Sequence, residues 1–177
     1  MPASSRGQRL PLYIRALAAS QSGSGSSAVS VENPFASANF SSDIASKTIG
    51  ELEAAAVAAS VKKDHERAAE LMKQAIGLEE QMGPPSGPPG LIKPSHELFG
   101  ELLLRAGKPE AAAEQFKVSL LRQPNRARSL LGAARAARQI GDQSGAQAAF
   151  TKLLEQWRYA DEGLPELREA RDYLQKH

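Results

Sequence analysis

The sequence predicts an all-α protein: a short α-solenoid of about three helix-turn-helix units, preceded by a disordered tail and closed by a C-terminal capping helix. Three observations lead to this prediction. From Ser42 onward the chain is rich in the helix formers Ala, Leu, Glu and Lys. No stretch alternates β-branched and polar residues between turn signals, as a half-buried strand would. A pattern of small and large residues recurs after 34 residues, which is typical of helical repeats.

The composition fits a folded domain and excludes several kinds of chemistry. Of the 177 residues, 41% are hydrophobic and only 5% are aromatic, so the core must come mainly from Leu and Ala. There is no Cys, which excludes disulfides and thiolate catalysis. The net charge of +2 is too balanced to indicate nucleic-acid binding by itself. No apolar run approaches the roughly 20 residues that span a membrane.

Residues 1–41 are expected to form a disordered, Ser/Gly-rich N-terminal tail. The stretch SQSGSGSSAVS resembles a flexible linker, and no acid appears before Glu32. Because Arg6, Arg9 and Arg15 lie in an acid-poor, weakly amphipathic segment, two interpretations of residues 1–20 stay open. One is an organelle transit peptide, and the other is a plain disordered tail with the cytoplasm as the default location.

Two glycines mark the repeat. Gly107 and Gly141 stand 34 residues apart, and each is expected to end one helix in a left-handed turn before the next begins. Pro109 suits the first position of the second helix, where its missing N–H is harmless. The other aligned pairs are Gly100 with Ala134, Leu103 with Ala137, Ala112 with Ala146, Phe116 with Phe150, and Ser119 with Leu153. The small residues let the two helices of a unit approach closely, and the Phe side chains fill the space toward the next unit.

A third and weaker copy lies upstream if Lys63 takes the place of Gly107. Ala68 then aligns with Ala112, and Met72 with Phe116. This offset is ten residues longer than the repeat, and the surplus is the Pro/Gly stretch GPPSGPPG, which is either a spacer or a polyproline ligand. Within a repeat domain of residues 42–177, the predicted units are 49–82, 93–126 and 127–160, with a Pro/Gly loop at 83–93.

The predicted cap covers residues 164–176. Pro165 suits a helix start, and Leu167, Ala170 and Leu174 share one face. The opposite face is charged. A terminal helix that is apolar toward the last unit and wet outside is what a repeat array requires.

The aligned positions of the repeat resemble the tetratricopeptide repeat, a helix-turn-helix unit of 34 residues. In the first clear copy they are Gly100, Leu103, Gly107, Ala112, Phe116 and Pro124. The second copy departs from the family pattern at Arg158, where the closing Pro would stand. The resemblance implies a protein-binding array whose first helices line a concave groove. Counted from the aligned glycines, the partner-binding places in that groove are Glu97, Glu101, Leu104, Arg105, Arg128, Leu131, Arg135, Arg138 and Gln139.

No set of residues indicates catalysis. His65, His96 and His177 lie far apart, and the chain has no His-Glu-x-x-His motif and no phosphate-binding loop. Glu97 and Glu101 form an i, i+4 carboxylate pair, which is far more typical of a solvated helix face than of acid–base chemistry. The sequence therefore predicts no catalytic residue, no metal site, no cofactor and no enzymatic activity.

Three arginines give the best indication of function. Arg128, Arg135 and Arg138 share one helix face, with Arg105 as a candidate extension and the apolar Leu104 and Leu131 between them. We call Arg128, Arg135 and Arg138 the arginine row. Because guanidinium groups bind carboxylates in a two-pronged geometry, the row suits an extended peptide that carries acids. The alternative is an ordinary solvated face.

The sequence thus predicts a non-catalytic interaction module or adaptor that binds a protein or peptide, with an acidic segment as the candidate ligand. One subclass of the family binds acidic C-termini through a clamp of basic residues, but this chain has Gly132, Glu53 and Val57 at clamp positions. The competing interpretation is a helical-repeat RNA-binding protein, which reads bases with side chains of successive units. Two clear repeats could read few bases, so nucleic acid is the less favoured partner. The sequence indicates neither the identity of the partner nor an oligomeric state.

Overall fold

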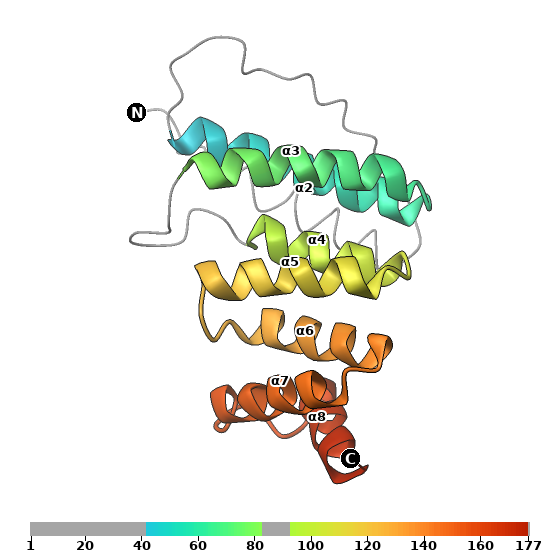
Figure 1. Ribbon diagram of the computed structural model, residues 1–177. Coiled ribbons are helices and arrows are strands. Elements are labelled where there is room, and N and C mark those ends of the chain that lie inside the picture. Colours follow the sequence, from blue (N-terminus) through green and yellow to red (C-terminus); the bar gives the residue numbers. More distant parts are fainter. Residues whose placement is uncertain (1–41, 83–92, 177) are drawn as a thin grey trace. The chain divides into compact units, whose positions relative to one another are not determined.

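The computed structural model describes residues 42–82 and 93–176 (Figure 1). These residues form seven α-helices and no strand, which confirms the all-α prediction. The helices are α2 (Ser42–Val61), α3 (His65–Gln81), α4 (Ser95–Arg105), α5 (Pro109–Arg122), α6 (Ala127–Ile140), α7 (Gln143–Gln156) and α8 (Pro165–Lys176). The predicted disordered tail, the targeting interpretation of residues 1–20 and nearly all of the Pro/Gly loop lie outside the described residues.

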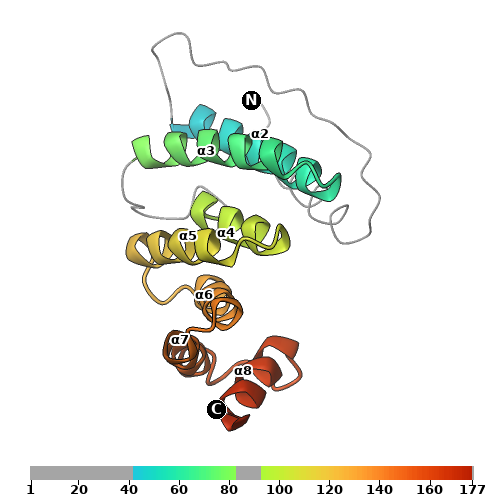
Figure 2. The same cartoon turned by 45° about the vertical axis from the view of Figure 1, so that its right-hand side comes forward.

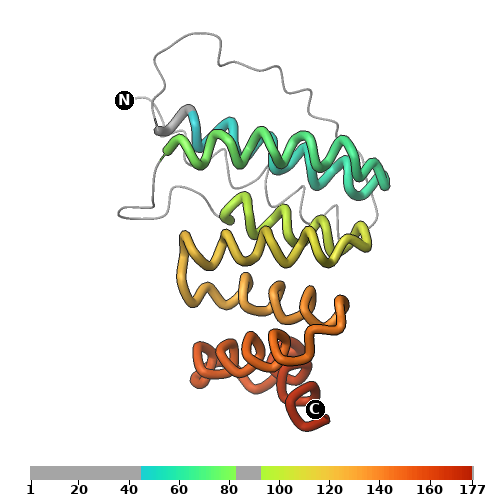
Figure 3. The backbone as a smooth tube through the Cα atoms, in the orientation of Figure 1, coloured from blue at the N-terminus to red at the C-terminus, as the bar shows by residue number. Residues whose placement is uncertain are grey.

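The chain divides into two compact units, residues 1–95 and 96–177. In the first, α2 and α3 form an antiparallel helical hairpin (Figure 3). Lys63 in the turn has a φ of 63°, the same left-handed conformation as Gly107, with which the sequence alignment pairs it. Asp64 then caps α3 by accepting the backbone N–H of Arg67 at 3.0 Å. Helix α2 starts before the expected unit boundary at residue 49, because the buried Ala45 and Ile49 continue its apolar face.

Replacing Lys63 by glycine is expected to stabilise this hairpin by up to about 1 kcal/mol. A side chain in the left-handed region costs roughly 1–2 kcal/mol, and the greater unfolded-state freedom of glycine offsets part of the gain. Urea unfolding followed by circular dichroism would measure the shift, with Lys62→Gly as the control beside it. A gain at position 62 that equals the gain at 63 would contradict the explanation.

The second unit contains the helices of the two clear repeats. Gly107 and Gly141 adopt φ values of 69° and 81°, so both predicted turns are confirmed. Helix α5 begins at Pro109, as expected, and Asn125 completes the connection to α6 with a φ of 64°. Helices α5, α6 and α7 lie side by side in chain order, and Figure 2 shows α6 and α7 nearly along their axes.

Two buried phenylalanines fill the spaces between helices of the second unit. The Phe116 ring of α5 reaches Gly100 on α4 and Gly132 on α6; a Cβ at Gly100 would lie 2.7 Å from its Cζ, and one at Gly132 would lie closer still. The Phe150 ring of α7 packs at 5.0 Å between ring centroids against Tyr173 of α8. Both phenylalanines thus face the next helical element along the chain, as the alignment predicts.

Burial follows the alignment in all three copies. The equivalent small residues Ala68, Ala112 and Ala146 are buried, and so are the equivalent large residues Met72, Phe116 and Phe150. Aligned positions are therefore equally buried in the three copies. This holds for the 34-residue offset between the two clear copies and for the longer offset to the first copy.

Helix α8 differs from the expected cap in one apolar position. Leu167 and Ala170 are buried as predicted, but Tyr173 takes the third buried place and Leu174 is only half-buried. The contact of Tyr173 with Phe150 explains why Tyr173 is buried in place of Leu174, because an aromatic pair at this spacing stabilises the packing beyond its buried area.

Candidate functional site

The candidate site is built on α6, which carries three arginines and no acid. The face of α6 that packs into the core includes Leu130, Ala134 and Ala137. Arg128 and Arg135 stand two turns apart with Leu131 between them, and Arg138 follows Arg135 by one turn. Because α6 is helical over all of these positions, the three arginines project from one side of it, as the sequence predicted.

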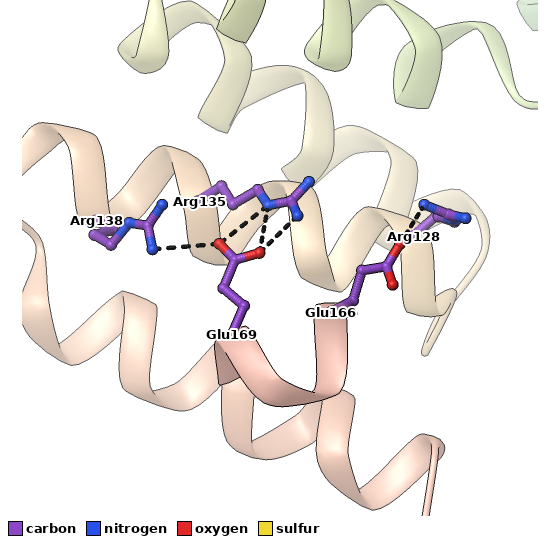
Figure 4. A network of polar contacts seen from close by, with 5 residues as sticks. All are labelled: Arg128, Arg135, Arg138, Glu166 and Glu169. Carbon is purple, nitrogen blue, oxygen red and sulfur yellow. Dashed lines mark hydrogen bonds and ion pairs between the residues drawn. The ribbon is translucent and has the colours of Figure 1, made fainter. Parts of the chain in front are cut away.

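The arginine row meets two carboxylates of α8 (Figure 4). Arg135 donates to Glu169 from Nε and from Nη2, at 3.0 Å and 2.6 Å to Oε2. Arg138 Nη1 lies 3.3 Å from Oε1 of the same Glu169. Arg128 Nη1 donates to Oε1 of Glu166 at 3.3 Å. All three guanidinium groups are therefore already paired with acids of the same chain.

This pairing corrects the expectation for the charged face of the cap. The sequence predicts a charged and wet outer face for this helix, but the side chains of Glu166 and Glu169 are only 19% and 22% exposed. The two residues are three apart, so they project from the same side of the helix toward α6. Helix α8 thus contributes two acids that pair with α6, beside its apolar contacts.

The charges of the site favour anion binding and no proton transfer. The hydrogen bonds from Arg135 to Glu169 raise the pKa of the Arg135 guanidinium above its already high value, against the lowering effect of burial. The negative charges of Glu166 and Glu101 also raise the pKa of Arg135. A guanidinium in this setting keeps its proton and can only attract and orient anions.

The ion pairs of the arginine row remain accessible to water. The side chains of Arg128, Arg135 and Arg138 are 56%, 39% and 44% exposed. Pairs with this exposure contribute about 0.2–1 kcal/mol each. The pairing is therefore weak compared with a buried salt bridge.

Glu97 is not a groove residue, contrary to the sequence prediction. Its carboxylate is fully buried and accepts from Arg126 Nε at 2.7 Å, from Arg126 Nη2 at 3.1 Å and from Ser129 Oγ at 2.6 Å. Ser129 and Ser119 complete the network through an Oγ to Oγ distance of 2.8 Å. The expected wet carboxylate pair of Glu97 and Glu101 is wrong for the same reason.

The other predicted groove residues divide into two groups. Leu131 is 2% exposed and belongs to the core around Phe150 and Tyr173, so it is covered rather than open. Glu101 and Leu104 are half-buried, whereas Arg105 and Gln139 are exposed. The structure thus brings Arg128, Arg135 and Arg138 together with two acids that were not assigned to the site, Glu166 and Glu169. A spacing of three residues between acids on the last helix was the only sequence signal for them.

The positions where the resemblance places clamp residues are used for packing. Glu53 and Val57 are buried, and Gly132 gives the Phe116 ring its space. A basic side chain at position 132 would collide with that ring, which explains the departure from the clamp pattern.

A second acidic cluster lies in the first unit. Ser95 donates its backbone N–H to Glu79 Oε2 at 2.6 Å and its Oγ to Glu53 Oε1 at 3.1 Å. Burial raises the pKa of the Glu53 carboxyl to about 8, the hydrogen bond from Ser95 lowers it, and the nearby charges of Glu79 and Lys93 raise and lower it in turn. Perturbed acids often mark active sites. Glu53 is only 2% exposed, however, so a substrate has no access to it, and a structural role is the better interpretation.

Glu53 is expected to make the stability of the first unit decrease as the pH rises. The carboxyl binds its proton more tightly in the folded chain than in the unfolded one, so its contribution is complete below about pH 4.5 and is lost as the pH approaches 8. Within that window the loss is at most about 1.4 kcal/mol per pH unit. Thermal melts of Glu53→Gln should show a gain over the wild type that grows from pH 5 to pH 8. The control is the exposed Glu66→Gln, and parallel curves for Glu53→Gln and the wild type would contradict the assignment.

Metal binding and membrane insertion find no support in the part of the chain that the structure describes. Within residues 42–82 and 93–176, no three His, Cys, Asp or Glu side chains gather as a metal site would require. None of the seven helices combines the length and apolar character needed to cross a membrane.

Comparisons of the chain with known protein families, with curated proteins and with solved structures found no match.

Proposed function

We propose that this chain is a non-catalytic protein-interaction module with tetratricopeptide-like repeats, and that its arginine row binds an acidic segment of a partner. The observation that carries the proposal is the pairing of Arg128, Arg135 and Arg138 with two carboxylates on a helix. The row has the spacing to hold acids that project from one side of a helix.

The chemistry of the row supports protein recognition. Arg135 presents Nε and Nη2 to one carboxylate, the two-pronged arrangement that makes arginine selective for carboxylates and phosphates. Leu131, Ala134 and Phe150 lie in the adjoining core and are buried there with Ala170 and Tyr173 of α8, so an apolar contact accompanies the ionic one in the pairing of α8 with the row. A helix with acids beside apolar residues matches both features.

The repeat assignment rests on several agreeing features. The left-handed turns at Lys63, Gly107 and Gly141 occupy the same place in each aligned copy. The positions that the family fills with small and aromatic residues are buried in each copy. Short arrays of such units commonly act as binding surfaces rather than as enzymes.

A peptide-display selection on the full chain tests the proposal. The bait is used in two forms, the wild type and Glu166→Gln/Glu169→Gln, in which no carboxylate of α8 occupies the row. We expect selected peptides to be rich in Glu or Asp spaced three or four residues apart. Their binding should fall at least tenfold in Arg135→Glu/Arg138→Glu, because two attractive contacts become repulsive.

The matched control is Lys152→Glu/Arg158→Glu, which makes the same charge change at exposed positions of the second unit. Selected peptides without acids, or peptides that bind the reversed row as well as the control, would overturn the proposal. RNA is the competing ligand, because arginine forks also bind phosphates. Three guanidinium groups can contact only a few phosphates, so we expect single-stranded RNA to bind weakly and to be released between low and physiological salt.

A further inference from the structure

Helix α8 occupies the arginine row to which the proposed partner would bind, so the inference that follows rests on the function proposed above. The helix lies against α7 and sends Glu166 and Glu169 to the row on α6. A ligand of the proposed kind would require the same guanidinium groups. The chain therefore carries its own helix with two acids three residues apart on the surface that is proposed to bind such a helix.

The surface under α8 combines an apolar floor with a charged edge. The floor is centred on Phe150 of α7, whose ring packs against Tyr173 of α8, and Leu131 and Ala134 of α6 belong to the same buried cluster. The edge is the arginine row (Figure 4). Such a surface fits an amphipathic helix that has two acids three residues apart and apolar residues next to them, as α8 has.

Helix α8 packs mainly on one neighbouring helix. It buries Leu167, Ala170 and Tyr173, as many residues as α5 or α7 buries, but it lies against α7, whereas α6 lies between α5 and α7. The arginines of its three ion pairs are 39–56% exposed, and pairs that stay accessible to water add little. The residues between α7 and α8 form turns rather than a helix. A terminal element that packs mainly on one neighbour opens locally at a lower free energy than the middle of a domain.

We propose that α8 is an internal occupant of this surface, and that a partner binds by displacing it with an acidic amphipathic helix of its own. In the closed chain, Glu166 and Glu169 hold the arginine row. In the bound chain, two acids of the partner hold it, and the partner's apolar residues replace Ala170 and Tyr173 on the floor. Because α8 is tethered to the chain, its effective concentration at this surface is high. The partner's apparent affinity is therefore reduced in proportion to the fraction of the chain that is open.

The test uses a labelled peptide that copies residues 164–177, with the side chains equivalent to Asp172 and Lys176 joined by a lactam. These two exposed residues stand four apart, so the link holds the peptide helical and lowers the entropy lost on binding. Fluorescence anisotropy compares the wild type with Glu166→Gln/Glu169→Gln, both as full chains. We expect about tenfold tighter binding to the double variant, because the exposed pairs that close the chain are removed.

Two controls isolate the acids of α8. Glu110→Gln/Glu114→Gln makes the same charge change at exposed positions of α5 and should bind the peptide as the wild type does. A peptide with Gln in place of both acids should lose its affinity for every form. Equal affinity of the wild type and Glu166→Gln/Glu169→Gln for the acidic peptide would overturn the inference.

Hydrogen exchange of the wild-type chain gives a second readout that needs no variant. At saturating peptide, the amides of α8 should lose protection while those of α5 keep it. Unchanged protection of α8 would show that the peptide binds elsewhere and would overturn the inference. A chain that forms dimers without peptide would also overturn it, because the surface would then serve the α8 of a second copy.

The outcome separates this inference from the proposed function. If acidic peptides bind through Arg135 and Arg138 but leave α8 in place, the function stands and the displacement fails. If no acidic peptide binds even when Glu166 and Glu169 are replaced, the proposed function itself fails.

Discussion

Replacing Arg126 by alanine is expected to destabilise the second unit by on the order of 3–5 kcal/mol, the range measured when one partner of a buried ion pair is removed. Glu97 is fully buried, and both of its oxygens accept from the Arg126 guanidinium. Without that guanidinium, the carboxylate stays in the interior and keeps the hydroxyl of Ser129 as a donor. The chain must then bury an uncompensated charge or protonate it, and both cost free energy.

Chemical unfolding followed by circular dichroism measures this effect, with the exposed Arg158→Ala as the matched control. The double variant Arg126→Ala/Glu97→Gln should recover part of the loss, because the amide carries no charge to bury. A double-mutant cycle over the two positions gives their coupling. A loss for Arg126→Ala no greater than that for Arg158→Ala would show that the pair does not hold the unit together.

Replacing Gly132 by leucine is expected to have the second large effect, at or beyond the upper end of the roughly 1–3 kcal/mol typical of overpacking. A Cβ at position 132 would overlap the end of the Phe116 ring, which is fully buried and also touches Gly100. The ring therefore has little room to move away. Even Gly132→Ala should destabilise the unit, although alanine is the better helix former by about 1 kcal/mol.

Gly77→Ala is the matched control for this prediction. Gly77 also lies inside a helix, but a Cβ there would meet no atom within 4 Å, so the same exchange should stabilise α3. Shortening the ring side chain with Phe116→Leu should reduce the cost of Gly132→Ala. Thermal melts that rank Gly132→Ala and Gly77→Ala alike would contradict the packing of Phe116 against α6.

Local features of the fold could be predicted from the sequence because their causes are local. A glycine that ends a helix needs a left-handed conformation, and Gly107 and Gly141 have it. A proline starts a helix readily, and α5 starts at Pro109. Lys63 could be placed in the same turn only through the alignment, since lysine itself gives no signal for a positive φ.

The candidate site could be predicted only in part. The spacing on α6 determines that Arg128, Arg135 and Arg138 share a face, and that much is a property of any helix. What covers this face depends on the direction of α8 after the turns that follow α7, and no spacing within one helix gives that direction. The same holds for Glu97, whose partner Arg126 lies 29 residues away. Charged side chains were therefore assigned to solvent where the tertiary structure pairs them.

The central claim is that the arginine row recognises paired acids on a helix, and an exchange of charges tests it most directly. The protein is Glu166→Gln/Glu169→Gln, with or without Arg135→Glu/Arg138→Glu. The probes are the lactam-linked peptide and a version with Lys at both acidic positions. Fluorescence anisotropy should show the acidic probe on the arginine form and the lysine probe on the glutamate form, with the two mismatched combinations at least tenfold weaker. Equal binding of the acidic probe to both forms, or failure of the lysine probe to bind the correctly folded glutamate form, would contradict the claim.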